Sequence, residues 1–338
     1  MTHTAKQLVP KVSVAMITYN HERFIAQALE SVLMQKTDFQ IELIIGEDCS
    51  TDGTRKIVKK YADLKPDIIR PFFYSNNCGV QKNLATVLKA CRSDYIACLE
   101  GDDYWTDPRK LQKQVAFMER NAQCSMCGSA VMDIHVSPDG KEREVGLYPE
   151  RTTKTLFSLE DVIIEYPFRT LTFMLRNGLV KLPEWFERVP YGDMSLLALY
   201  GAKGPIGFMS EVTGNYRKHV GGVYSSLSLF EKHKALGKTL DLLNAHFSGQ
   251  YFKVFGERDF RFSKLICRQA IYAGCGGDAR KIYWESFRRF AACKPISYAA
   301  LGFSIFAWHP LKKRVAIRER LQKLSKSFKY LAKNNTTL

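Results

Sequence analysis

The sequence predicts an α/β fold: a doubly wound, mostly parallel sheet flanked by helices, followed by a helical, basic C-terminal extension. Three observations support this prediction. Short apolar runs alternate with segments of helical periodicity over the first hundred residues. Polar and acidic residues follow these runs, as they do at the carboxyl ends of parallel strands. The 338 residues are 46% hydrophobic and 25% charged, which excludes a disordered or collagen-like chain.

Strands and helices are expected to alternate in the first 120 residues. The apolar runs predict strands at 11–18, 41–45, 71–74 and 94–99. Apolar residues at helical spacing predict helices at 22–35, 54–64 and 79–91. Asp107 and Pro108 predict the start of a fourth helix, as its cap and first residue. Repeated βα units of this length favour a parallel sheet.

The pattern changes after residue 134. The turn residues at 138–140 predict a hairpin, and residues 151–225 mix short helices and strands. From residue 228 onward the sequence is mainly helical in pattern and basic. We therefore expect two domains, 1–225 and 226–338.

Charge is distributed unevenly along the chain. Residues 1–150 hold 19 basic and 20 acidic side chains, whereas residues 151–338 hold 31 and 14, a net charge of +17. Such an excess indicates an anionic partner: nucleic acid, a membrane surface or a phosphorylated substrate.

The cysteines indicate the compartment. Nine cysteines show no paired metal-ligand spacing, and the one CxxC, Cys124 to Cys127, lies in an apolar run that predicts a strand with buried thiols. An odd number of cysteines without a framework is typical of a reducing cytosol. Neither a signal peptide nor a run of 18 uncharged apolar residues is present in the sequence, so we expect a cytoplasmic location.

Carboxylates and amides cluster after three of the predicted strands. The clusters are Thr18 with Asn20, Glu47 with Asp48, and Glu100 with Asp102 and Asp103. Such a concentration of negative charge favours a bound cation or hydrogen-bonded ligand, and adjacent carboxylates suit a divalent ion that also binds phosphate oxygens. Alternatively, Asp48 caps the next helix, and Asp102 and Asp103 form a solvated turn. Three clusters at equivalent strand ends favour the functional interpretation.

The motifs that contain these clusters resemble a family 2, GT-A fold glycosyltransferase of the bacterial surface-polysaccharide type. The resemblance rests on residues 12–20, 47–54 and 99–105 and extends over about 10–225. It implies a nucleoside diphosphate sugar donor, commonly UDP-linked, and a divalent metal, Mn²⁺ or Mg²⁺. The residues that it assigns to the nucleotide sugar are Thr18, Asn20, Asp48, Lys82, Glu100 and Asp102. Glu100 replaces the first acid of the family's Asp-x-Asp motif, whereas Asp102 retains the second.

Two later segments extend the resemblance. Asp193 occupies the position of the family's catalytic base, with Gly192 where a preceding acid is usual. A helix N-cap is the alternative role for Asp193, and the two roles are compatible. The segment 215–219 resembles the family's late Tyr-Arg-x-His motif, which implies His219 as a metal ligand, with Arg217 or Lys218 facing the diphosphate. A surface histidine is the alternative for His219. The implied metal ligands are therefore Asp102, Asp103 and His219.

The end of the chain combines an apolar segment with a basic one. Residues 296–308 carry no charge, and the following residues, to 333, combine basic side chains with an apolar stripe. This composition predicts an interfacial helix on an anionic membrane surface, through 296–333. An amphipathic helix packed on the core is the alternative. The sequence contains no recognisable nucleic-acid-binding module, so we expect no nucleic acid partner.

Together these features predict a metal-dependent inverting glycosyltransferase, peripheral to the inner face of the cell membrane. It would transfer a sugar from its donor to a hydroxyl of a lipid-linked surface glycan. The rival hypothesis is a non-catalytic peripheral membrane protein that binds a nucleotide without turnover.

Overall fold

The computed structural model describes residues 9–150, 152–222 and 226–307, which form two compact units. The first unit runs to Val162 and includes residues 166–188 and 192–218. The second comprises 163–165, 189–191 and the described residues from His219 onward.

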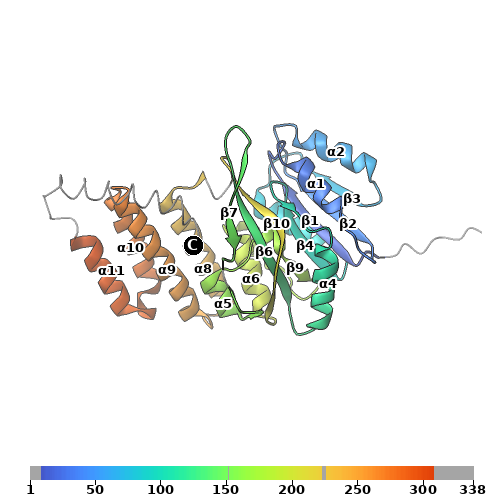
Figure 1. Cartoon of the computed structure of the whole chain (residues 1–338). Coiled ribbons are helices and arrows are strands. Elements are labelled where there is room, and N and C mark those ends of the chain that lie inside the picture. The colour runs from blue at the N-terminus through green and yellow to red at the C-terminus, as the bar shows by residue number, and fades with distance from the viewer. Residues whose placement is uncertain (1–8, 151, 223–225, 308–338) are drawn as a thin grey trace, which may run out of the picture. The chain divides into compact units, whose positions relative to one another are not determined.

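The first unit is built on a ten-stranded sheet (Figure 1). Its strands are β1 (Val12–Thr18), β2 (Ile41–Glu47), β3 (Ile69–Phe73), β4 (Tyr95–Glu100), β5 (Tyr104–Trp105), β6 (Met126–Val136), β7 (Glu142–Tyr148), β8 (Leu156–Phe157), β9 (Met174–Arg176) and β10 (Ile206–Lys218). Eight of them run in the order β3-β2-β1-β4-β9-β6-β10-β5, while β7 pairs with β6 and β8 with β10. Parallel pairing joins β3, β2, β1 and β4, and β9 is antiparallel to both β4 and β6. Because β10 is parallel to β6, six of the eight strands point the same way.

This sheet confirms the predicted α/β class. Each predicted strand of the first hundred residues is present within two residues of its expected ends, because uninterrupted apolar runs suit strands buried on both faces. The hairpin is confirmed too, since β6 and β7 pair around a turn in which Gly140 has φ of 88°. The predicted start of the fourth helix is wrong. That helix begins at Lys110, and Asp107 instead accepts the Arg109 amide in the preceding turn at 2.8 Å.

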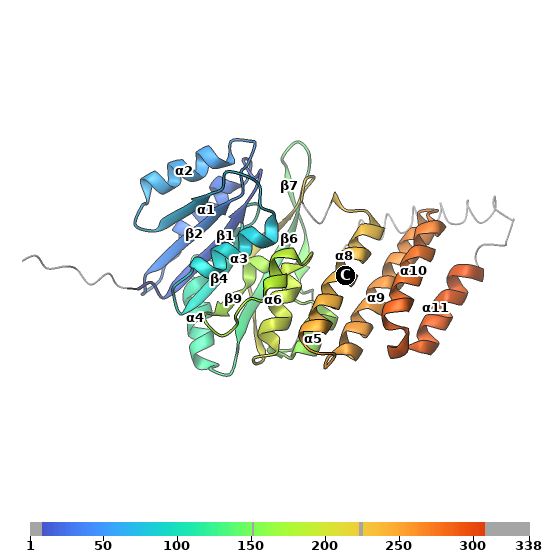
Figure 2. The ribbon, with the colours of Figure 1, turned by 180° about the vertical axis from the view of Figure 1, so that it is seen from behind.

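Helices cover both faces of the sheet in the first unit. They are α1 (Ile25–Leu33), α2 (Thr54–Leu64), α3 (Val80–Ala90), α4 (Lys110–Arg120), α5 (Leu159–Glu165, which passes into the second unit) and α6 (Gly192–Gly201), with 3-10 turns η1 (Thr170–Thr172) and η2 (Glu184–Arg188). In Figure 1, α1 and α4 lie in front of the sheet, and Figure 2 shows α3 and α6 on the other face. Their inward faces bury aliphatic side chains against the strands, which provides the hydrophobic driving force for the layered core.

Trp105 anchors the loop after β4. Its side chain is 1% exposed, and its indole Nε1 donates to the carbonyl of Leu171 at 2.8 Å. The ammonium of Lys110 lies 4.1 Å from the ring centroid, and burial lowers the pKa of this lysine to about 7. Trp105 therefore fixes the loop in place.

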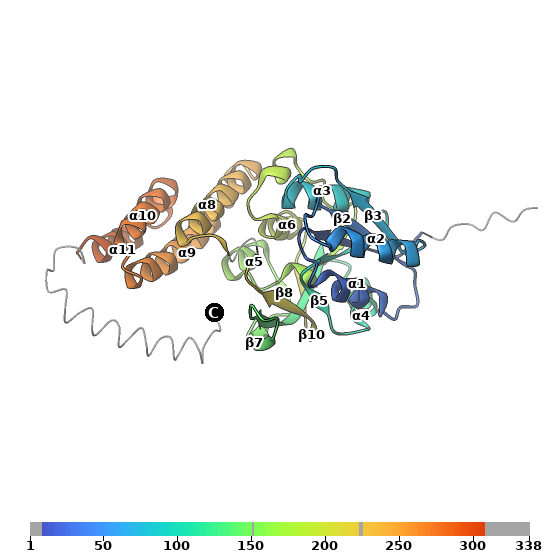
Figure 3. The same ribbon diagram turned by 90° about the horizontal axis from the view of Figure 1, so that it is seen from above.

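The second unit contains α8 (Leu229–His246), α9 (Phe252–Tyr272), α10 (Gly276–Phe290), η3 (Ala291–Cys293) and α11 (Pro295–Ala307) (Figure 3). The start of α8 is stabilised by a capping box, in which Ser228 and Glu231 accept each other's backbone amides. Among the described residues, no helix combines the length and apolarity needed to cross a membrane. Most of the predicted basic segment, from 308 to 333, lies outside the described residues.

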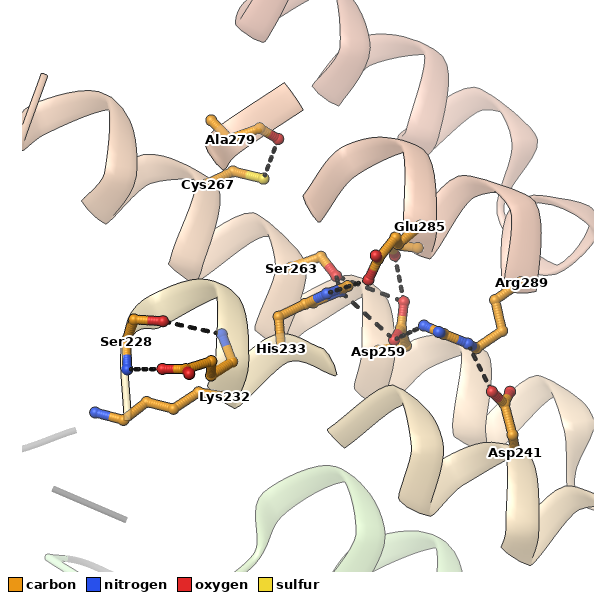
Figure 4. Close-up of polar contacts among 12 residues, drawn as sticks. Ser228, Lys232, His233, Asp241, Asp259, Ser263, Cys267, Ala279, Glu285 and Arg289 are labelled. Carbon is orange, nitrogen blue, oxygen red and sulfur yellow. Dashed lines mark hydrogen bonds and ion pairs between the residues drawn. The ribbon is translucent and has the colours of Figure 1, made fainter. Parts of the chain in front are cut away.

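A buried polar network connects the helices of the second unit (Figure 4). Asp259 on α9 is fully buried and accepts hydrogen bonds from Ser286 on α10 and, at 3.2 Å, from Tyr298 on α11. Arg289 lies 3.7 Å from Asp259 and donates to Asp241 on α8 at 3.0 Å. Because buried charges are costly unless paired, this network specifies how the four helices pack.

All nine cysteines are free thiols, and Cys124 and Cys127 are buried as predicted. Burial raises the pKa of the Cys127 thiol to about 12, so this thiol is inert at neutral pH.

Candidate active site

The ends of three parallel strands meet at one edge of the sheet. β1 lies between β2 and β4, with Thr18 opposite Glu47 and Ile17 opposite Glu100. The Asp48 amide donates to the Thr18 carbonyl at 3.0 Å, and Gly101 donates to Ile17 at 2.9 Å. The three polar clusters found in the sequence therefore lie side by side, where ligands bind in doubly wound sheets.

Thr18 and Asn20 organise the end of β1. Asn20 has a left-handed φ of 55°, and its side-chain oxygen accepts the Thr51 amide at 2.8 Å. Its own amide donates to Ser50 Oγ at 3.0 Å. Thr18 Oγ1 lies 3.3 Å from Nδ1 of His21. Asn20 thus connects the loops after β1 and β2, the two loops predicted to contact the nucleotide.

Asp48 holds the loop that precedes α3. Its carboxylate is 2% exposed and accepts the backbone amides of Cys78 at 2.7 Å and Gly79 at 2.9 Å. The Cys78 thiol also hydrogen-bonds to this carboxylate, so Asp48 organises the loop from several sides. Lys82 lies exposed in the first turn of α3, close to this loop.

Three carboxylates crowd the end of β4. Burial, and then the charge of Asp102, raises the pKa of Glu100 to about 8, and the charge of Asp193 adds to this effect. Burial and the charges of Asp102 and Glu100 raise the pKa of Asp103 well above its ordinary value. Asp102 is the more accessible of the two aspartates, and its Oδ2 lies 3.6 Å from Nε2 of His21. Like charges held this close favour a bound cation.

Arg217 hydrogen-bonds to the loop after β4, which carries Asp102 and Asp103. Its backbone amide donates to Asp103 Oδ1 at 2.7 Å, and its Nη1 donates to the Asp102 carbonyl at 2.9 Å. Its other nitrogens donate to Glu142, at 2.6 Å, and to Gln27. The expectation that Arg217 faces the diphosphate is wrong, because its side chain is 2% exposed and bound at three points. Lys218 pairs with Asp133 at 2.8 Å.

Asp193 is the second residue of α6, and its charge contributes to the raised pKa of Glu100. Its Oδ2 accepts a hydrogen bond from the phenol of Tyr166, and its Oδ1 accepts the Met194 amide at 2.7 Å. His219 is the first residue of the second unit's main segment, and its Nδ1 lies 3.1 Å from the Val220 carbonyl. Its role as a metal ligand stays a prediction.

The sequence did not predict that His21 lies beside Asp102, that Tyr166 contacts Asp193 or that Arg217 supports the loop with Asp102 and Asp103. Arg217 lies in the 215–219 motif, but its contact with Asp103 spans 114 residues of sequence. Tyr166 carries no motif at all, so no sequence pattern indicates it.

The acidic group fits a divalent cation in one respect. Oε2 of Glu100 is buried and has no hydrogen-bond partner among the described residues. Within the same residues, however, no group of three or more potential ligands could by itself hold a metal ion. A cation here would take Asp102 from the chain and complete its coordination with phosphate oxygens and water, which suits Mg²⁺ or Mn²⁺.

The comparisons with known proteins identify the family. Residues 13–179 match Glycosyl transferase family 2. An uncharacterized protein of Mycobacterium tuberculosis is 33% identical over 220 residues, which are 64% of this chain and 61% of that protein. The chain thus spans less than two thirds of that relative's length. The UDP-Glc:alpha-D-GlcNAc-diphosphoundecaprenol beta-1,3-glucosyltransferase WfaP of Escherichia coli is 38% identical over 108 residues, which are 32% of this chain and 41% of WfaP.

Two solved structures share the fold. S. aureus TarS 1-349 in complex with UDP-GlcNAc has a TM-score of 0.52 and 20% identity, covering 82% of this chain and 91% of that chain. Mannosyltransferase PcManGT from Pyrobaculum calidifontis, in complex with GDP-Man and Mn²⁺, has a TM-score of 0.52 and 15% identity, covering 96% and 85%. The family match agrees with the fold of the two neighbours and with the acidic strand ends of the sheet. The chain belongs to glycosyl transferase family 2 and has the GT-A fold.

Proposed function

We propose that this protein transfers a sugar from a UDP-linked donor to a hydroxyl of a lipid-linked surface glycan, with inversion at the anomeric carbon. The observation that carries the proposal is that the charges of Asp102 and of Asp193 both act on Glu100 at the end of β4 and raise its pKa. The candidate base is thereby within electrostatic reach of the carboxylate cluster that we propose binds the donor diphosphate through a metal.

The donor would bind across the ends of β1, β2 and β4. Thr18, Asn20 and Asp48 line the loops expected to contact the nucleoside, with Lys82 nearby and Glu100 toward the ribose. WfaP acts on UDP-Glc by its name, and TarS has been solved with UDP-GlcNAc, which supports a uridine nucleotide. PcManGT has been solved with Mn²⁺, which supports a divalent metal. Asp102 is the accessible ligand that we propose for it, while the roles of Asp103 and His219 as ligands stay predictions from the sequence.

The chemistry is a single displacement. Asp193 accepts the proton of the acceptor hydroxyl while the hydroxyl oxygen bonds to the anomeric carbon. The bond from that carbon to the diphosphate breaks on the opposite face, and UDP leaves with the electron pair. A bound Mn²⁺ or Mg²⁺ would supply charge neutralisation on the leaving diphosphate. The chain's own part is to place the donor, the base and the acceptor oxygen in line.

The acceptor is proposed to be presented at an anionic membrane surface. The name of WfaP includes a diphosphoundecaprenol acceptor, which supports a lipid carrier. Ile296, the second residue of the apolar helix α11, is 85% exposed, and the net charge of +17 over residues 151–338 suits anionic lipid. Both features support peripheral attachment at the inner face of the cell membrane through residues 296–333. Sedimentation with phosphatidylglycerol vesicles, compared with phosphatidylcholine vesicles, tests this part independently of catalysis.

The catalytic proposal is tested with a panel of nucleotide sugars and release of the nucleoside diphosphate as readout. With Mn²⁺ or Mg²⁺ the protein should at least slowly hydrolyse its donor, and EDTA should stop the reaction. Asp102→Ala and Asp193→Asn should each reduce turnover by about 100-fold or more. Asp63→Ala is the matched control, because Asp63 is an exposed aspartate on α2, in the same unit.

Inactivity of the wild-type protein across the whole panel would favour the rival, a nucleotide-binding protein without turnover. Equal turnover in wild type and Asp102→Ala would overturn the role of Asp102.

A further inference from the structure

Tyr166 is held in an unusual backbone conformation next to the candidate base. It ends α5 with φ of 50° and ψ of 61°, the left-handed region that residues other than glycine rarely adopt. Its amide donates to the Val162 carbonyl at 3.1 Å, and its own carbonyl accepts a hydrogen bond from the Tyr148 phenol. A left-handed tyrosine is sterically unfavourable, so its neighbours must maintain this conformation.

This conformation directs the Tyr166 phenol to Asp193, to which it donates a hydrogen bond at Oδ2. Burial, and then the charge of Asp193, raises the pKa of Tyr166 well above its ordinary value. The phenol therefore keeps its proton at neutral pH and remains a hydrogen-bond donor.

The two oxygens of Asp193 are held by donors from different segments. Oδ1 accepts the amide of Met194 at 2.7 Å, while Oδ2 accepts the phenol of Tyr166. Two donors on two oxygens fix the plane of a carboxylate, yet each oxygen retains a lone pair that can accept a proton.

The position before Asp193 is Gly192, which has no side chain to orient the carboxylate. A Cβ on Gly192 would lie 2.1 Å from Oε1 of Gln81. A side chain at this position would have to displace the Gln81 amide, and in this chain Tyr166 makes the polar contact with Asp193 from another part of the sequence.

We propose that Tyr166 is a positioning residue, which orients the Asp193 carboxylate toward the acceptor hydroxyl. The inference rests on the proposed function, in which Asp193 is the base. Tyr166 itself exchanges no proton with the substrate: its hydrogen bond restricts Asp193 to one rotamer and one plane, so that proton transfer begins from an aligned geometry.

The test is Tyr166→Phe in the full-length chain, which keeps the ring and removes only the hydroxyl. We expect kcat for sugar transfer to fall about 10- to 100-fold, while KM for the donor stays within about 3-fold. Replacement of Tyr166 by p-aminophenylalanine, which restores a donor at the same position, should recover at least about a third of kcat. Tyr61→Phe is the matched control, because Tyr61 donates to a carboxylate oxygen of Glu30 at 2.7 Å on the surface of the same unit.

Asp193→Asn separates this inference from the function on which it rests. Full activity of Asp193→Asn would remove Asp193 as the base and overturn the proposed mechanism itself. Inactive Asp193→Asn together with an unchanged kcat in Tyr166→Phe would leave the function intact and overturn the positioning role. If Tyr166→Phe folds poorly, the p-aminophenylalanine variant decides: kcat below about a tenth of wild type in the folded protein overturns the proposal.

Discussion

Arg217 donates its backbone amide to the Asp103 carboxylate at 2.7 Å, although the two residues are 114 positions apart. The same arginine bonds the Asp102 carbonyl, Glu142 and Gln27 through its guanidinium. Strand β10, which carries Arg217, thereby holds the loop with Asp102 and Asp103 in place. A rigid support of this kind is what a carboxylate site needs, because small displacements of catalytic groups are costly.

Arg217→Lys should therefore impair the site without touching the substrate. An ammonium group cannot reproduce three hydrogen bonds in the fork geometry of guanidinium. We expect the free energy of unfolding to fall by about 1–3 kcal/mol and donor turnover to fall at least about 10-fold. Urea unfolding and a donor-hydrolysis assay measure the two effects. The exposed Arg92 offers the control Arg92→Lys, which should change neither. Unaltered turnover in a folded Arg217→Lys protein would show that the site does not need Arg217 to support the loop with Asp102 and Asp103.

Gly101 is expected to tolerate no side chain. A Cβ at this position would lie 2.6 Å from Oγ1 and 2.8 Å from Cβ of Thr18. Gly101→Ala must then displace the loop that carries Asp102 or the end of β1, and we expect turnover to fall about 10-fold or more. Gly277→Ala, at a position with open space around the added carbon, is the control. Wild-type kinetics in Gly101→Ala would show that this close packing does not matter for the site.

His233 should make the second unit less stable in mild acid. The ring is fully buried, and its environment contains Ser263 at 2.9 Å, Glu285 at 3.7 Å, Asp259 at 3.9 Å and, more distantly, the charge of Arg289. Burial, and then Arg289, lowers the pKa of His233 from 6.5 to about 4. Below pH 6.5 the unfolded chain binds a proton that the folded chain excludes, so stability is lost as pH falls from 6.5 to 4.

The lost stability amounts to about 3 kcal/mol over that pH interval. Urea unfolding followed by circular dichroism at several pH values measures it. His233→Gln should flatten this part of the profile, whereas His135→Gln, at an exposed position in the first unit, should not. Identical pH profiles for wild type and His233→Gln would refute the assignment.

Asp259→Ala should destabilise the helical second unit strongly. The substitution removes the common acceptor of Ser286 and Tyr298 and leaves the Arg289 guanidinium with Asp241 alone among the partners described here. Loss of one partner from a buried charged network costs about 3–5 kcal/mol. Asp278→Ala, which breaks only a 3.9 Å pair with Lys281 on the surface, is the control. Equal unfolding midpoints for the two variants would mean that the network contributes little.

Much of the fold follows from local patterns. The runs at 12–18, 41–47 and 95–100 are strands because several apolar residues in succession can be buried only between two layers. The start of α4 did not follow the local pattern, since Asp107 satisfies the turn before the helix and not the helix itself. The sequence also contains no periodicity that predicts the 13 residues of β10, whose pairing with β6 is interrupted by register shifts.

The sequence alone determined the α/β class, the free buried thiols and the three polar strand ends, because each depends on residues that are neighbours along the chain. The family motifs lie in those same segments. Only the tertiary structure decided that Arg217 supports Asp103, that Tyr166 faces Asp193 and that Asp259 joins three helices of the second unit. These contacts join residues 27 to 114 positions apart, and they depend on strand order, on one left-handed residue and on the packing of helices. No local pattern encodes such relationships, because they arise from the cooperative burial of the whole chain.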